Sequence, residues 1–316
     1  MTKPYLLGFA LIGVAALGAM PLLAQPASPG VPGVSESQAR AMQFETSVVE
    51  LAKRLNEGPP VPGLSRQKRT ERVEFVAGNV RFVANHELAH ALIAELKLPV
   101  LGREEDTADV YAILKALRLR SKFSDRTLVS ASKAWFVSAG RGRRRGESST
   151  YYERHSLDEQ RAYQIICLMV GFDPIKFKAL ADAHKLPEDR RQSCGWDFDT
   201  TAASWDRVMA PHLRSAHQPK TSIEVSYGEA AGSLEAVARV FREIRFLETL
   251  AEFAAETYLW PAPIKMEMRT CGYANASWTN QTRTLLICYE MVEDFAQLFR
   301  ELEQSGKPQT RVRGRN

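Results

Sequence analysis

Apolar residues recur at helical spacing along most of the chain and alternate at strand spacing only towards its C-terminal end. Helices are predicted at residues 39–55, 75–96, 104–120, 157–170, 200–213 and 234–257. The segment 75–96 is long, mostly apolar and free of proline, so we expect its body to be a buried helix. Strands are predicted near 221–227, 264–270 and 282–289. The pattern therefore indicates an α+β fold that is mainly helical and carries a small β-sheet.

The first residues of the chain have the order of a secretory signal peptide. Lys3 precedes an apolar region of about sixteen residues, and the small residue Ala24 offers a cleavage point. This region is shorter than the roughly 20 residues of a membrane-spanning helix. We therefore expect residues 1–24 to be a signal peptide or an uncleaved signal anchor, and the protein to be periplasmic or secreted. The alternative is a buried core helix. Residues 25–37 are rich in Pro, Gly and Ser and should form a loose linker.

The four cysteines suit an exported chain, in which an even number favours disulfides. Three pairings are possible. Cys271 and Cys288 flank what we predict to be a hairpin with its turn at residues 278–281, and Cys167 and Cys194 would then form the second bond. The competing interpretation is a structural zinc ion held by all four thiolates, although the chain has no C-x-x-C pair.

The composition is that of an ordinary globular protein, with 45% hydrophobic, 25% charged and 9% aromatic residues among 316. It excludes collagen-like, wholly disordered and polytopic membrane proteins. The 42 Lys and Arg only slightly exceed the 37 Asp and Glu, and the net charge is +5. We therefore expect no nucleic-acid partner.

Two short segments carry much of the positive charge. One is residues 140–146, and the other is the C-terminal tail, 310–316. The arginines of the first are Arg141, Arg143, Arg144 and Arg145. We expect a solvated loop and a frayed tail. The functional alternative is a weak contact of these arginines with an anionic envelope surface.

The long apolar segment contains the pattern His86-Glu87-Leu88-Ala89-His90. Residues i and i+4 lie on the same face of a helix, so His86 and His90 can bind one ion. Zinc needs three protein ligands to leave a fourth position open, and Glu87 lies where it can hold a water molecule at that position. The alternative is a pair of core histidines hydrogen-bonded to their neighbours.

A second acidic motif follows shortly after, at the expected start of the next helix. Glu105 and Asp109 are spaced i and i+4, so both can face the histidine pair. We interpret Glu105 as the third metal ligand and Asp109 as the carboxylate that orients a ligating histidine. Glu104 and Asp106 should point to other faces and be solvated. The alternative for the whole motif is a charge cluster that stabilises a helix start.

These motifs resemble those of a known family. The run NHELAHALI at 85–93, followed by LPVLGREEDTAD at 98–109, resembles a bacterial family of proposed zinc metallopeptidases whose physiological role is unknown. The EDTAD segment is similar to the E-x-x-A-D third-ligand motif of gluzincin peptidases, including the membrane-embedded type that processes prenylated proteins. Further similar segments are HSLDEQR at 155–161, LPEDR at 186–190, Cys194, CGYANA at 271–276 and CYE at 288–290.

The resemblance implies a zincin-like fold. We expect a catalytic domain at 38–215 and a C-terminal α/β segment at 216–316 packed on the same domain. It also implies one zinc ion held by three residues. These are His86, His90 and Glu105.

In such a site zinc lowers the pKa of its water towards about 7, and Glu87 takes the proton and returns it to the leaving amine. His155, just before a predicted helix, is our candidate for stabilising the oxyanion, although a structural role is the alternative. Arg161 could pair with the acidic cluster. The edge of a small sheet beside the active-site helix would bind an extended peptide.

The sequence thus predicts a zinc metallopeptidase that hydrolyses peptide bonds in the cell envelope or outside the cell. Two alternatives belong to other classes. One is a metallopeptidase-like binding or assembly protein of the envelope that hydrolyses nothing. The other is a basic envelope-binding module, which requires the arginines to cluster on the surface.

Overall fold

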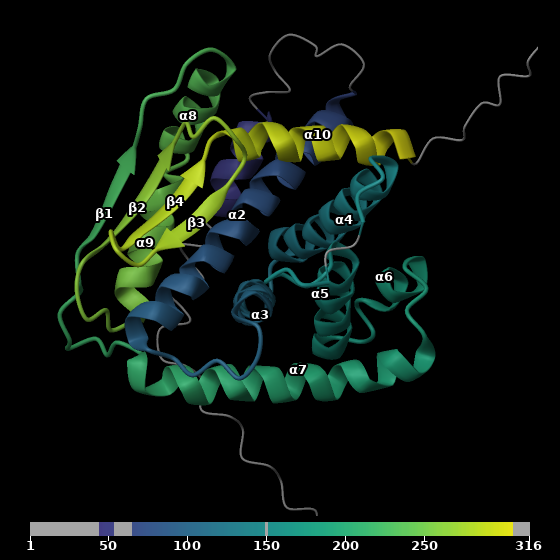
Figure 1. Cartoon of the computed structure of the whole chain (residues 1–316), viewed down its shortest axis with the longest axis horizontal. Coiled ribbons are helices and arrows are strands. Elements are labelled where there is room, and N and C mark those ends of the chain that lie inside the picture. Colours follow the sequence, from purple (N-terminus) through teal and green to yellow (C-terminus); the bar gives the residue numbers. More distant parts are fainter. Residues whose placement is uncertain (1–43, 54–64, 149–150, 306–316) are drawn as a thin grey trace, which may run out of the picture. The chain divides into compact units, whose positions relative to one another are not determined.

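Helices form most of the structure, a computed structural model that describes residues 44–53, 65–148 and 151–305 (Figure 1). These residues belong to one compact unit, Gly33–Asn316. Besides the helical residues 44–53, the α-helices are α2 (Arg66–Leu96), α3 (Glu104–Arg118), α4 (Lys122–Arg144), α5 (Asp158–Phe172), α6 (Lys178–Ala183), α7 (Glu188–Met209), α8 (Ser233–Glu243), α9 (Phe246–Thr257) and α10 (Glu290–Ser305). The strands are β1 (Ile223–Tyr227), β2 (Ile264–Arg269), β3 (Ala276–Thr279) and β4 (Thr284–Cys288).

The structure confirms the predicted mainly helical α+β fold. The predicted signal peptide, the linker and the basic tail at 310–316 lie outside the described residues. None of the helices in the described part of the chain is long and apolar enough to cross a membrane.

Several helix predictions need correction. The buried helix begins earlier than expected, because Ser65 caps it by accepting a hydrogen bond from the backbone N–H of Lys68 at 3.2 Å. The segment 234–257 is two helices, broken at Arg245, whose φ is 52°. The helix predicted at 200–213 begins earlier, at Glu188, and ends at Met209, and we did not predict α4, α6 and α10.

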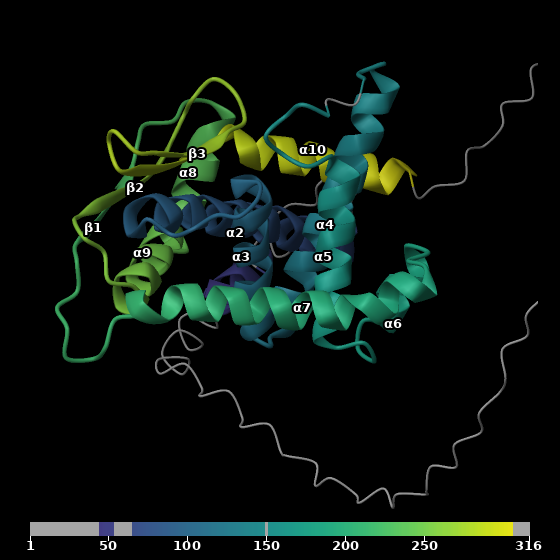
Figure 2. The same cartoon turned by 60° about the horizontal axis from the view of Figure 1, so that its bottom comes forward.

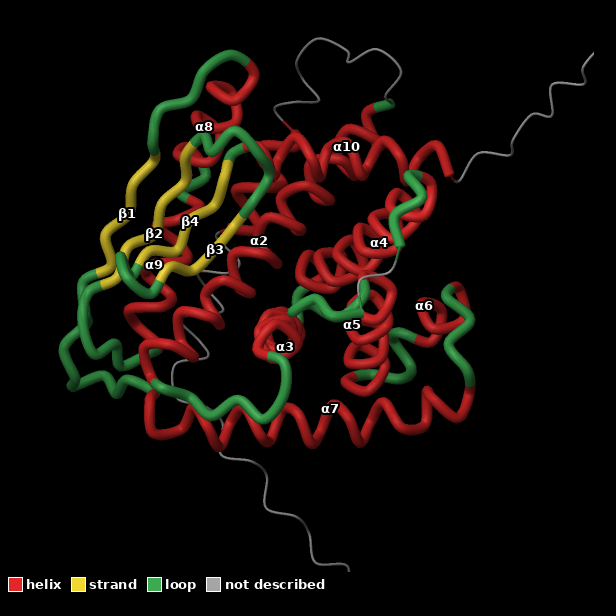
Figure 3. Tube along the Cα trace, viewed as in Figure 1, coloured by secondary structure: helices red, strands yellow, loops and turns green. Residues whose placement is uncertain are grey.

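The predicted strands exist, but their pairing differs from our prediction. The sheet has the order β1-β2-β4-β3, in which β2 pairs with both β1 and β4 in parallel (Figure 3). The hairpin partner of β4 is β3, which is antiparallel to it and lies at the edge of the sheet. Strand β3 is only four residues long and contains one strongly apolar side chain, Trp278, so alternation could not reveal it.

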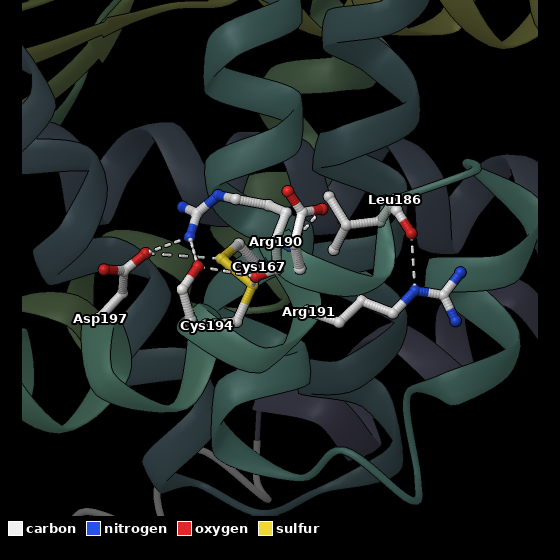
Figure 4. Close-up of a disulfide and its surroundings, with 8 residues drawn as sticks. Cys167, Leu186, Arg190, Arg191, Cys194 and Asp197 are labelled. Carbon is white, nitrogen blue, oxygen red and sulfur yellow. Dashed lines mark hydrogen bonds and ion pairs between the residues drawn. A yellow bond between two sulfur atoms is a disulfide. The ribbon is translucent and has the colours of Figure 1, made fainter.

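Two disulfides link elements that pack together. Cys271–Cys288 ties the loop after β2 to the end of β4. Cys167–Cys194 joins α5 to α7, and Figure 4 shows it beside the ion pair of Arg190 with Asp197. Both predicted bonds are therefore present. Two disulfides are typical of an extracellular or otherwise oxidising environment.

Helices α5 and α7 approach very closely next to the second disulfide. A Cβ atom added at Gly171 would lie 2.1 Å from the carbonyl oxygen of Cys194. Only a glycine permits this contact between the two backbones.

Helix α2 lies at the centre of the molecule. It packs against α3, α4, α10, β3 and β4, while α4 and α7 both pack against α5 (Figure 2). The half of α2 that carries the histidines is buried on almost all sides. Polar groups placed there must consequently find partners inside the protein.

The basic segment 140–146 is not the loop that we predicted, because α4 continues through Arg144. Arg141 pairs with Asp294 at 2.8 Å and with Glu301 at 3.0 Å, both on α10. Carboxylates also pair with Arg143 and Arg144. These ion pairs connect the end of α4 to α10 and α5. Contact of the arginines with an anionic surface stays a prediction.

Candidate metal centre

Two imidazoles and a carboxylate meet at the contact of α2 with α3. The Nε2 atoms of His86 and His90 are 3.1 Å apart. The Oε2 atom of Glu105 lies 3.2 Å from the first and 3.1 Å from the second. All three residues are buried, with exposed fractions of 5%, 9% and 7%. Sequence spacing predicted this set, and the structure brings its members together.

The outer nitrogen of each ring faces a carboxylate. His86 Nδ1 donates to Asp109 Oδ1 at 2.8 Å, and His90 Nδ1 donates to Glu104 Oε1 at 2.7 Å. These bonds place the Nδ1 protons outside the cluster, so each neutral ring turns the lone pair of its Nε2 inwards. We expected Glu104 to point to another face and be solvated; its side chain is 40% exposed, but it turns towards α2 and contacts His90, which its spacing from Glu105 did not reveal.

The inner atoms fit a metal ion. When both rings are neutral, these atoms present only electron pairs to one another, and either a proton or a metal cation between them relieves this. Tetrahedral coordination with bonds of about 2.0–2.1 Å separates ligand atoms by about 3.3 Å. The observed separations of 3.1 to 3.2 Å are close to this value. His86, His90 and Glu105 could hold a tetrahedral ion and leave one position open.

Asp109 is fixed in turn by a buried arginine. Arg161 Nε donates to Asp109 Oδ2 at 2.7 Å, and Arg161 Nη2 donates to Oδ1 at 2.8 Å. The guanidinium carbon lies 3.7 Å from the ring centre of Trp135. A salt bridge for Arg161 was one predicted alternative. The contact orients Asp109 and, through it, the His86 ring.

The pKa values indicate that the cluster stabilises positive charge. Burial disfavours the charged form of His86, but contacts with Asp109 and Glu105 outweigh it and raise its pKa to about 9. Burial also raises the pKa of Asp109, yet Arg161 and His86 bring it down to about 2. Burial likewise opposes ionisation of Glu105, but hydrogen bonds from His155, His86 and His90 hold its pKa well below the ordinary value. The carboxylates are therefore ionised at neutral pH.

Glu87 lies beside the cluster without being one of the three converging ligands. Burial raises its pKa above the ordinary value, while His86 and His90 act in the opposite direction. A backbone hydrogen bond from Trp278 of β3 also lowers it. The edge strand β3 therefore reaches the α2 turn that carries the centre.

The loop before α5 adds two groups to the centre. His155 Nε2 lies 2.9 Å from Glu105 Oε2, and its ring stacks on His86 with centres 6.2 Å apart. Arg154 lies 3.3 Å from Glu105 Oε1. Both are exposed, with side-chain fractions of 49% and 76%. We named His155 from the sequence and missed Arg154, since a single arginine in a loop gives no pattern.

Fold and site together define a class of protein in which a helix-borne His-Glu-x-x-His pair joins a carboxylate of the next helix. A comparison with models of known protein families points to the same class. The family described as "Putative metallopeptidase" matches residues 61–209 and 229–315. The chain belongs to this family. Searches of curated proteins and of solved structures found no match.

Proposed function

We propose that the protein is a zinc-dependent metallopeptidase that acts outside the cytoplasm. The observation that carries this proposal is the convergence of His86, His90 and Glu105 within 3.2 Å, with Glu87 beside them. Membership of the family supports hydrolase activity. The two disulfides support export.

His86, His90 and Glu105 would hold the zinc ion. When bound, zinc supplies Lewis acidity, which polarises a peptide carbonyl and acidifies a water molecule. Glu87 would accept the proton of that water and deliver it to the leaving amine, and its raised pKa suits a group that must both take and give a proton.

His155 suits the stabilisation of charge on the substrate. Its exposed ring lies at the rim of the cluster and is held by Glu105 alone among the described hydrogen-bond and ion-pair partners. Once Glu105 serves as a ligand, His155 is free to donate to the carbonyl oxygen of a substrate. Strand β3 supports binding of an extended peptide, because one of its edges has no strand partner in the described sheet.

The experiment is peptide hydrolysis by wild type and Glu87→Gln over a panel of fluorogenic peptides and unfolded proteins. We expect hydrolysis by the wild type and a loss of at least about a hundredfold in the variant, with zinc content unchanged. If the wild type binds zinc but cleaves nothing in the panel, the non-catalytic binding protein becomes the better account. Equal rates in both proteins would refute the role of Glu87.

A further inference from the structure

A second polar site lies on another face of the contact between α2 and α3. A cavity of about 40 Å³ opens there between α2, α3, α9 and the helical residues 44–53. We call it the side cavity. Residues that decide its chemistry are Arg81, Asn85, Lys115, Phe246, Leu250 and Phe253. The cavity has room for about three or four water-sized groups.

Two cations line the side cavity and lack close anionic partners. Arg81 Nη1 is buried without a hydrogen bond, and the carboxylate of Glu45 lies 3.8 Å from it. Lys115 Nζ lies 3.4 Å from the ring centre of Phe253 and makes no hydrogen bond or ion pair with the described residues. The carboxylate of Glu45 is itself occupied by the hydroxyls of Ser121 and Ser124. Partly buried cations whose nearest counter-charge is distant or missing are costly.

A buried acceptor next to the cations is also unpartnered within the described chain. The Nδ2 atom of Asn85 donates to the carbonyl oxygen of Arg81 at 2.8 Å. This bond fixes the amide and leaves Asn85 Oδ1 buried without a donor. Asn85 as a whole is 6% exposed. The cavity therefore combines two cationic side chains with two buried atoms, Arg81 Nη1 and Asn85 Oδ1, that have no hydrogen-bond partner among the described residues.

The electrostatics agree with the geometry. Burial lowers the pKa of Lys115 well below its ordinary value, and the charge of Arg81 lowers it further. Burial also lowers the pKa of Arg81 to about 10, although Glu45 opposes this. An anion placed between the two groups would relieve both effects.

The remaining wall is apolar, with Phe44, Phe246, Leu250 and Phe253. We propose that the side cavity binds a small organic carboxylate, with its charged end between Arg81 and Lys115 and a short aliphatic stem against the phenylalanines. A neutral molecule would leave the cations unpaired, and an inorganic anion would leave the apolar wall uncovered. The site is separate from the metal centre and does not depend on the proposed peptidase function.

The test is thermal unfolding of the purified protein in propionate, with sodium chloride at equal ionic strength as the reference. We expect a saturable rise in Tm, by about 5–10 °C at a hundredfold excess over the dissociation constant. Propionamide, the neutral analogue, should give no rise. A smaller effect of propionate than of inorganic phosphate would overturn the assignment of an organic carboxylate.

Two variants separate this site from general charge effects. Lys115→Met removes the cation while keeping most of the volume, and it should abolish the propionate effect and raise Tm without ligand. Lys122→Met makes the same change of charge at an exposed position and should respond like the wild type. An unchanged response of Lys115→Met would overturn the proposal, as would a lack of response in the wild type.

A measurement on the wild type keeps the test decisive if Lys115→Met does not fold. NMR of ¹³C-labelled lysine side chains would follow the titration of Lys115 with and without saturating propionate. We expect propionate to raise the pKa of Lys115. A titration that propionate leaves unchanged would overturn the proposal.

Discussion

Replacing Asp109 by asparagine tests the chain of contacts behind the metal centre. Asp109 is 2% exposed and accepts from His86 Nδ1 and twice from Arg161. An amide has the same shape but one oxygen fewer. In one orientation its NH₂ group faces Arg161 Nε, and in the other it faces His86 Nδ1 and Arg161 Nη2. Asp109→Asn therefore brings donors against donors in either orientation.

We expect Asp109→Asn to lower both the stability of the protein and its affinity for zinc. Arg161 becomes a buried cation without a counter-charge, so the free energy of unfolding should fall by about 3–5 kcal/mol. His86 loses the acceptor that fixes its ring, so zinc affinity should fall about 10–100-fold, or about 1.4–2.7 kcal/mol. Urea unfolding of the zinc-free protein measures the first effect, and competition with a fluorescent chelator measures the second.

Glu104→Gln is the matched control, because Glu104 makes the same kind of contact with His90 from a side chain that is 40% exposed. It should weaken zinc binding in the same direction but cost less than about 1 kcal/mol of stability, since the amide can turn to solvent. Wild-type zinc affinity in Asp109→Asn would refute the reasoning. So would equal stability losses in the two variants.

Three further predictions concern pH, packing and the disulfides. In the zinc-free protein the raised pKa of His86 stabilises the fold fully below about pH 6.5, and this contribution is lost as pH rises through about 9, so urea unfolding should show a loss of about 2 kcal/mol between pH 7 and 9. Gly171→Ala should lower stability by about 3 kcal/mol, whereas Gly195→Ala, whose added Cβ meets nothing within 4 Å, should be neutral or stabilising in thermal unfolding. Replacing Cys271 and Cys288 by alanine should lower stability by about 3 kcal/mol in urea, and an unchanged midpoint would contradict this.

The helix-borne residues of the candidate site could be predicted because helical geometry fixes them. His86 and His90 share a face by their spacing, as do Glu105 and Asp109. Spacing alone does not show that α2 packs against α3. We inferred this packing because the histidines of a buried α2 need polar partners, and the carboxylates of the next helix can supply them.

The rest depended on side-chain orientation and long-range pairing. Glu104 turns back towards His90 although its neighbour Glu105 faces the same cluster, and nothing local distinguishes that rotamer. Strand β4 pairs with β2 in parallel because the chain crosses over to β3 first, whereas alternation of residues does not determine strand direction. Helix α4 continues through Arg144 despite Gly140 and Gly142, and its contacts with α10, such as those of Arg141 with Asp294 and Glu301, join residues too far apart in the sequence to be foreseen.

The central claim is that three side chains hold one metal ion. Elemental analysis of the purified wild type, His86→Ala and Glu105→Ala, all prepared without chelator, tests it most directly. The account predicts about one zinc per chain in the wild type and its loss in both variants. A wild type without zinc, or a Glu105→Ala variant that retains it in full, would contradict the account.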